Sequence, residues 1–311
     1  MPHAVHSLLA RCGQRAAPAS LAARSARRWR CLAAGMLLGT TIAHAQTPAA
    51  TTPDTSVDPV LMGRAADILY SRQLASLRAA QLLDTDRAAL GRARRVGDRL
   101  LPRVTAVVPP GVRWSARLSL ETRNEPVALC LPNGSVLVST GLLQLPLDDA
   151  ELAAILAHVI AHQVNGDHAR AAARAYRQRR EGVDPDANRA AVELADILGK
   201  LVGSPHDDAA AEKAADALAL ELLARSGVNP AAAARAWRKV VQAGDASAPA
   251  LLALHPTPPE RIADLEALAA QLAPVYEQAL ADAAAAPPPP PPETRPSTSR
   301  HLPPRMPKPT P

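Results

Sequence analysis

The stretch ILAHVIAHQV, residues 155–164, places two histidines four positions apart in an otherwise apolar run. Such a run predicts a buried helix, and residues i and i+4 of a helix lie one turn apart on the same face. His158 and His162 are therefore expected to aim both imidazoles at one point, and Zn²⁺ prefers nitrogen ligands of this kind. The spacing also arises by chance in Ala- and Leu-rich helices, so a plain core helix is the alternative.

A second stretch supplies carboxylates at the same spacing. In AAAEKAADALALELLARSGVNP, residues 209–230, Glu212 and Asp216 are again one helical turn apart. Glu212 offers a third ligand to a metal held by the two histidines. Asp216 can accept the free N–H of a ligand histidine and so orient its ring. A solvated helix face is the alternative for both residues.

The N-terminal part of the chain predicts an exported protein. Residues 1–45 contain six arginines and no acidic residue, then the uncharged stretch CLAAGMLLGTTIA and an Ala-His-Ala site. This combination predicts a secretory signal peptide and a periplasmic or secreted protein of a bacterial envelope. The apolar stretch is shorter than the roughly 20 residues of a membrane span.

Removal of the signal peptide on export would change the net charge and the number of cysteines. The whole chain has a net charge of +6, and six arginines leave with the signal peptide. The remaining chain is about neutral, which argues against nucleic acid as a partner. Cys130 is then the only cysteine, so no internal disulfide is expected.

Composition divides the remaining chain into three parts. Residues 46–58 predict a flexible polar linker. Residues 286–311, with six consecutive prolines from Pro287, predict a disordered tail that acts as a spacer or binds a partner. Between them, residues 60–285 predict one domain.

The domain predicts an α+β fold, mostly helical with a small antiparallel sheet. Helical periodicity covers residues 60–101, with Pro102 expected to end the helix, and it returns from Asp148 onward. Three stretches predict antiparallel strands, the last two joined by a Pro-Asn-Gly turn: 112–121, 127–131 and 135–139. Further helices are predicted over 188–203, 208–226, 230–243 and 258–282.

Four stretches, in this order along the chain, resemble the zincin metallopeptidases of family M48. That family includes the CAAX prenyl endopeptidases, HtpX and the periplasmic BepA-type proteases. The stretches are VALCLPNGSVLVSTGLL (127–143), ELAAILAHVIAH (151–162), EKAAD (212–216) and HPTPPERI (255–262). The resemblance implies a zincin-like fold, zinc as the cofactor, and His158, His162 and Glu212 as its ligands. It also implies that Asp216 supports the ligands and that His255 can reach the open position of the metal.

The chain departs from this family after the first histidine, where Val159 replaces the glutamate that acts as general base. Valine cannot accept a proton, and general acid–base catalysis contributes typically ~10²–10⁴-fold. Three explanations are open: a pseudoprotease that keeps its zinc, another carboxylate such as Glu193 or Glu151 in the site, or an error in the sequence. Glu151 lies two helical turns before His158, which disfavours it.

A peptide-binding surface is predicted beside this site. The strand formed by Ser135, Val136, Leu137, Val138 and Ser139 is expected to be an edge strand that binds an extended polypeptide by β-augmentation. Pro126 also indicates an edge position, because proline cannot donate a hydrogen bond to a neighbouring strand.

Three functional hypotheses follow from these features. The first is a periplasmic zinc protein of envelope quality control, close to the membrane, that binds extended or misfolded polypeptides with weak or no cleavage. The second is an active metalloendopeptidase with an unusual base. The third is a metal-free helical adaptor that binds partners through its Pro-rich tail.

Overall fold

The computed structural model describes residues 57–179, 186–204 and 208–285. The predicted signal peptide, nearly all of the predicted linker and the predicted Pro-rich tail lie outside these residues. The described elements are α1 (Pro59–Ala79), α2 (Arg87–Val107), β1 (Leu118–Glu121), β2 (Ala128–Cys130), β3 (Val136–Ser139), α3 (Thr140–Gln144), α4 (Asp149–Val164), α5 (Asp167–Gln178), α6 (Ala187–Leu201), α7 (Ala209–Arg225), α8 (Ala232–Ser247), α9 (Pro249–Leu254), α10 (Pro259–Gln271) and α11 (Ala273–Ala285). None of these helices combines the length and apolarity that a bilayer crossing requires. The predicted α+β class, mostly helical with a small sheet, is confirmed.

The three strands form one mixed sheet in the order β1–β3–β2. β2 and β3 pair antiparallel through the predicted hairpin, in which the Leu131 N–H donates to the Ser135 carbonyl at 2.9 Å. β1 pairs parallel with β3, so the prediction of a wholly antiparallel sheet is wrong. The chain leaves β1, forms β2 at the far edge and returns through the hairpin, which places β3 beside β1 in the same direction.

The strand order also corrects the prediction of the edge strand. β3 has a paired strand on each side, so the segment Ser135–Ser139 is not an edge and cannot accept a further strand. Each of its five residues is at most 7 % exposed. The edge strands are β1 and β2, and the position of Pro126 just before β2 agrees with the edge that this proline indicated.

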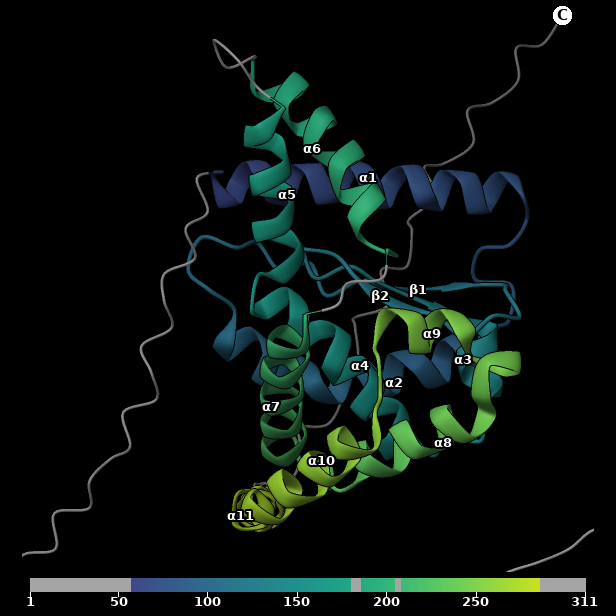
Figure 1. The fold of residues 1–311 in the computed structure, drawn as a ribbon, viewed down its shortest axis with the longest axis vertical. Helices are drawn as coiled ribbons and strands as arrows, with labels where there is room; N and C mark the ends of the chain where they lie inside the picture. The colour runs from purple at the N-terminus through teal and green to yellow at the C-terminus, as the bar shows by residue number, and fades with distance from the viewer. Residues whose placement is uncertain (1–56, 180–185, 205–207, 286–311) are drawn as a thin grey trace, which may run out of the picture. The chain divides into compact units, whose positions relative to one another are not determined.

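Helices cover both faces of the sheet (Figure 1). Leu120, Ala128 and Val138 belong to the core that the sheet forms with α2 and α4. Leu129 and Leu131 pack on the opposite face against the core of α1, α5 and α6. The sheet therefore separates two apolar cores, and α4 lies in the first of them.

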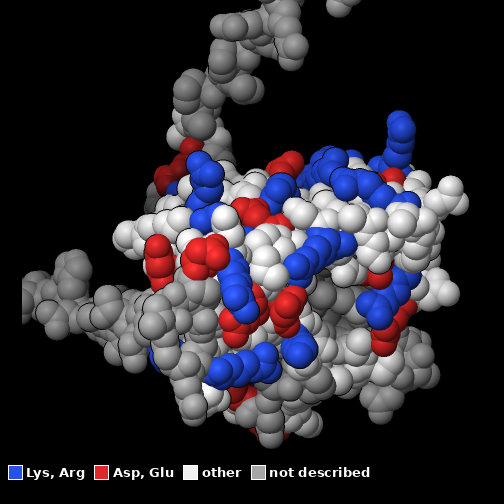
Figure 2. Space-filling model, turned by 90° about the horizontal axis from the view of Figure 1, so that it is seen from above, with Lys and Arg blue, Asp and Glu red and all other residues white. Residues whose placement is uncertain are grey.

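Charged side chains of both signs are interspersed on the face seen from above (Figure 2). Among the pairs that join α1 to α6, Arg72 contacts Asp196 at 2.7 Å. Arg64 donates a further hydrogen bond to Asn188.

Two predicted helices are each interrupted in the structure. The predicted helix 60–101 divides into α1 and α2, because Gln81 and Asp84 take positive φ angles and Asp86 caps a new helix by accepting from Ala89 N–H at 2.9 Å. Pro102 lies inside α2 instead of ending it. Its ring is on the exposed side while Leu100 and other residues of the buried face hold the helix in place. The predicted helix 258–282 likewise consists of α10 and α11.

Helix α4 is the central element of the domain. Asp148 and Glu151 form a capping box at its start, which satisfies the first free N–H groups of the helix. From Glu151 to Val164 every residue is buried, because α4 packs against α2, α7, α8 and β2. This burial fixes the two histidines of α4 inside the first core.

A close approach of two backbones at Gly141 gives a stability prediction. A Cβ atom at Gly141 would lie 2.0 Å from the carbonyl oxygen of Asn124. Gly141→Ala is therefore expected to lower the free energy of unfolding by about 1–3 kcal/mol. Gly63→Ala is the control, since a Cβ there meets nothing within 4 Å and is expected to stabilise α1 by up to about 1 kcal/mol. Urea unfolding measures both changes, and an unchanged midpoint for Gly141→Ala would contradict this packing.

Candidate metal centre

Three segments far apart in the sequence bring four possible ligands together. Helix α4 carries His158 and His162, helix α7 carries Glu212, and His255 directly follows α9. The i, i+4 spacing on α4 places both of its imidazoles on the side that faces α7. The three residues predicted as ligands are thus adjacent, and His255 joins them.

The ligand atoms of these four residues lie close together, all within 4.8 Å of one another. His158 Nε2 lies 3.1 Å from His162 Nε2 and 3.0 Å from His255 Nδ1. The carboxylate oxygens of Glu212 lie 3.3, 3.1 and 3.2 Å from His158, His162 and His255, respectively. Metal–ligand bonds of about 2.0–2.1 Å in tetrahedral geometry put neighbouring ligand atoms roughly 3.3 Å apart. The observed spacing fits an ion of this kind.

Two further carboxylates orient the histidine rings. Asp216 Oδ1 accepts from His158 Nδ1 at 2.9 Å, which is the role predicted for it. Asp167 Oδ2 accepts from His162 Nδ1 at 2.8 Å. With both Nδ1–H groups donated, the two Nε2 atoms turn their lone pairs toward each other. These lone pairs repel each other, and a cation between the two Nε2 atoms removes this repulsion. A proton could also bridge the two Nε2 atoms, but it could not contact the other ligand atoms at the same time.

The pKa values also indicate that positive charge is stabilised between the histidines and the carboxylates of this cluster. Burial lowers the pKa of His162, but hydrogen bonds to Asp167 and Glu212 outweigh it and raise that pKa to about 9. Burial would raise the pKa of Glu212, yet its bonds to the histidines hold it well below the usual range. Burial lowers the pKa of His255 to about 3, so its imidazole is neutral at pH 7. A carboxylate and a neutral imidazole are the forms that bind metal ions, so Glu212 and His255 are in these forms at pH 7, whereas His162 has to release a proton when a metal binds.

Arg261 of α10 closes the outer side of this cluster. Its guanidinium contacts Asp216 at 2.7 Å and Glu212 at 2.8 Å. The same group lies 4.6 Å above the ring of Trp237, a cation–π distance. Since Glu212 and Asp216 each face a cation on this side, part of the buried negative charge of the cluster is compensated.

The four possible ligands are buried. His158 and His162 are each 1 % exposed, His255 is 5 % exposed and Glu212 is 6 % exposed. Catalytic zinc sites use three protein ligands and leave one position for water, whereas structural sites have four. With His255 the cluster offers four possible protein ligands, the number that structural sites use.

Val159 occupies the place predicted for the missing base. It is 4 % exposed, and with His162, His255 and strand β2 it lines a cavity of about 20 Å³. That volume admits about one water molecule and no peptide. On the side of Val159, the site therefore has neither a proton acceptor at position 159 nor a cavity that admits a peptide.

The alternative bases lie elsewhere. Glu151 is buried at the start of α4, where its carboxylate contacts Lys239 at 2.7 Å and caps the helix. Glu193 lies on α6, which belongs to the other core. Neither residue is part of the four-ligand cluster found among the described residues. The proposal that one of them replaces the base is thus contradicted by the fold.

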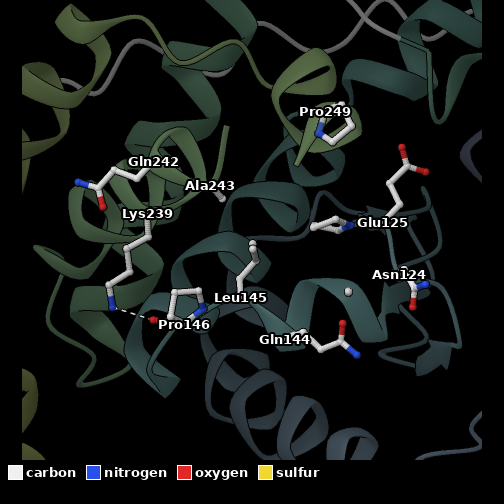
Figure 3. A pocket seen from close by; sticks show the side chains of 11 residues that line it. Asn124, Glu125, Gln144, Leu145, Pro146, Lys239, Gln242, Ala243 and Pro249 are labelled. Atoms are coloured by element: carbon white, nitrogen blue, oxygen red, sulfur yellow. Dashed lines mark hydrogen bonds between the residues drawn. The ribbon is translucent and has the colours of Figure 1, made fainter. Parts of the chain in front are cut away.

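A much larger hollow, of about 840 Å³, lies beside the start of β2 (Figure 3). Asn124, Glu125 and Pro126 form one wall, and residues of α8 and Pro249 of α9 form the opposite one. Lys239, near its rim, donates to the Pro146 carbonyl at 2.8 Å. The hollow is formed mainly by amide and proline side chains and holds no ligand atom of the metal cluster.

The sequence analysis missed two residues of the centre, Asp167 and Arg261. Asp167 follows His162 by five positions, and it reaches the ring only because Gly166 takes a positive φ of 78° between α4 and α5. Helical spacing therefore gave no indication of it. Arg261 lies within the stretch HPTPPERI, which carried the family resemblance. The sequence analysis did not predict that its guanidinium is buried among carboxylates.

One known protein family matches the part of the chain that contains these residues. The family described as Peptidase family M48 matches residues 91–181 and 208–269. These ranges contain both histidines of α4, as well as Glu212 and His255. No curated protein matches the chain.

Proposed function

The chain belongs to peptidase family M48, a family of metallopeptidases, and we propose that it is a zinc protein of the bacterial envelope that holds polypeptides and cleaves them poorly or not at all. One observation carries this proposal: four possible ligand atoms converge on one point, while position 159, directly after the first histidine, is a valine. The signal peptide expected from residues 1–45 supports the envelope location.

Zinc is the metal that suits this donor set best. Three imidazole nitrogens and one carboxylate oxygen match the ligands that Zn²⁺ prefers. Bound there, zinc would supply positive charge among buried acceptor atoms and, given an open position, Lewis-acid activation of water. The ligands link α4, α7 and the segment between α9 and α10, so binding is expected to fasten these elements together.

Two features of the chain oppose efficient proteolysis. Val159 offers no group that takes a proton from water or returns one to a leaving amine. His255 directs its Nδ1 to within 3.2 Å of both His158 Nε2 and Glu212 Oε1, where a substrate carbonyl or water would have to be. Asp167 and Asp216 hold the rings of His162 and His158 in the orientation that keeps this closed arrangement.

Strand β2 supports the binding of extended polypeptides. Leu131 N–H donates to Ser135 and Ser139 N–H to Val127, so by antiparallel alternation the N–H and C=O groups of Ala128 and Cys130 point away from β3. Ala128 and Cys130 are only 1 % and 3 % exposed, so a peptide reaches these groups only when neighbouring residues shift, and the hollow of Figure 3 lies beside the residues that lead into β2. A polypeptide held in the hollow can extend toward the edge, whereas the 20 Å³ cavity beside the metal ligands is too small for it.

Filling the hollow is expected to weaken polypeptide binding. Ala243 of α8 lines the hollow, and Ala243→Trp should lower the affinity for unfolded, reduced casein at least about tenfold, measured by fluorescence anisotropy. Val241, on the same helix, is 43 % exposed and outside the hollow, so Val241→Trp is the control and should leave the affinity unchanged. Equal affinities of the wild type and Ala243→Trp would place the binding surface elsewhere.

Casein incubated with the zinc-loaded protein separates this proposal from its alternatives. We expect the protein to bind casein without cleaving it. We also expect a chelator to abolish this binding. Efficient chelator-sensitive cleavage would instead identify an active metalloendopeptidase with an unusual base. Protein that contains no zinc when purified without chelators would favour the metal-free adaptor.

A further inference from the structure

A second cleft lies between α7 and α10, on the outer side of the metal centre. Its volume is about 590 Å³. The inner end reaches Glu212, Asp216 and Arg261, all of which are engaged in the ion pairs described above. The cleft is separate from the hollow beside β2, since the two share no lining residue.

The lining combines an apolar floor with an acidic rim. Leu265 is buried and Leu268 is half-buried in the floor, which also includes alanines of both helices and prolines of the segment before α10. Three acidic residues of the rim are exposed, Asp208, Glu260 and Asp264. Lys213 is the one exposed basic residue in this lining, and it pairs with Asp264 at 3.1 Å. The rim therefore has a net negative charge and fits a segment with basic and apolar side chains.

The C-terminal segment of the chain has this chemistry. Residues 293–311, ETRPSTSRHLPPRMPKPTP, contain one acidic residue and four basic ones, interspersed with leucine, methionine and prolines. The segment follows α11, which ends at Ala285 and packs against α7 and α10. The 26 residues from 286 to 311 can span at most about 90 Å, whereas α10, with 13 residues, is about 20 Å long. The tail is thus long enough to return to the cleft.

We propose that the α7–α10 cleft binds residues 293–311 of the same chain. The basic side chains of the tail lie against Glu260 and Asp264, and its apolar side chains cover Leu265 and Leu268. Tethering raises the effective concentration of the tail to the millimolar range, so weak contacts suffice. Occupied in this way, the cleft shields the side of the metal centre that Glu212 and Arg261 form.

Trypsin tests this docking on the full chain without any label. Trypsin does not cut before proline, so within residues 293–311 it cuts only after Arg300 and Arg305. Mass spectrometry can follow both cuts over time, with a free peptide of residues 293–311 as the unprotected reference. Docking predicts cuts at least about tenfold slower in the protein than in the peptide. It also predicts that high salt removes this protection, because exposed charge pairs are screened.

Charge reversal at the rim identifies the surface. Glu260→Lys/Asp264→Lys should bring both cuts to the rate of the free peptide. Glu193→Lys/Asp196→Lys makes the same change in charge on α6 and should keep the protection. Protection that survives Glu260→Lys/Asp264→Lys, or cuts in the wild type as fast as in the peptide, would overturn the proposal. Protection that increases over a hundredfold range of protein concentration would also overturn it, since it would show docking onto a second copy.

Discussion

Removing the metal is expected to lower the melting temperature of the domain by about 10 °C. An ion present at 1,000 times its dissociation constant adds about 4 kcal/mol to stability, and each kcal/mol shifts the melting temperature of a domain of this size by about 2–4 °C. The physical reason is the convergence of His158, His162, Glu212 and His255, whose buried ligand atoms all lie within 4.8 Å of one another and lose their common cation.

The control for this prediction is a variant that cannot hold the metal. Glu212→Gln keeps the shape of the side chain and removes its charge. It should melt near the temperature of the chelated wild type and show no further shift when chelator is added. Calorimetric scans of both proteins, with and without chelator and after zinc is restored, measure the effect. If the chelator left the melting temperature of the wild type unchanged, the prediction that a metal stabilises the domain would be contradicted.

Restoring the two missing elements of catalysis together is expected to raise casein cleavage by about 10²–10⁴-fold over the wild type. Val159→Glu places a carboxylate in the cavity beside His162, and His255→Ala frees the fourth ligand position for water. General acid–base catalysis accounts for the magnitude. Each single substitution should give little activity, because either the base or the open position is still missing.

Four zinc-loaded proteins make this test complete: the wild type, the two single variants and the double variant. Zinc content and melting temperature must be measured for each, so that a loss of metal is not mistaken for a lack of chemistry. Equal activity of Val159→Glu alone and the double variant would show that His255 does not block the site. A folded, zinc-loaded double variant without activity would contradict the role given to position 159.

The possible ligands could be predicted from the sequence because the spacing within each helix decides which side chains share a face. His158 and His162 share a face through helical spacing alone, and the same holds for Glu212 and Asp216. The family resemblance supplied the pairing of these two helices and the approach of His255. The structure adds the distances and the burial of the ligands.

The strand order was not accessible from local patterns. The alternation of residues 112–121 and the Asn-Gly turn identify strands and a hairpin, but neither says which side of the hairpin β1 joins. The structure places β1 beside β3, and this single pairing moved the free edge from Ser135–Ser139 to β2. The peptide-binding surface that we propose therefore lies beside β2 instead of at Ser135–Ser139.

The charged residues around the metal ligands depend on tertiary contacts in the same way. Asp167 reaches His162 across the turn at Gly166, and Arg261 reaches Glu212 from α10. The break between α1 and α2 depends on the backbone angles at Gln81 and Asp84, which apolar periodicity does not encode. Helix type was therefore predictable, whereas helix ends and contacts between helices were not.

X-ray absorption at the zinc edge, combined with metal analysis of protein purified without chelators, tests the closed four-ligand centre most directly. We expect one zinc per chain with three nitrogen ligands and one oxygen ligand at about 2.0–2.1 Å, and the loss of one nitrogen ligand in His255→Ala. Protein without stoichiometric metal, or a coordination shell that His255→Ala leaves unchanged, would contradict the account.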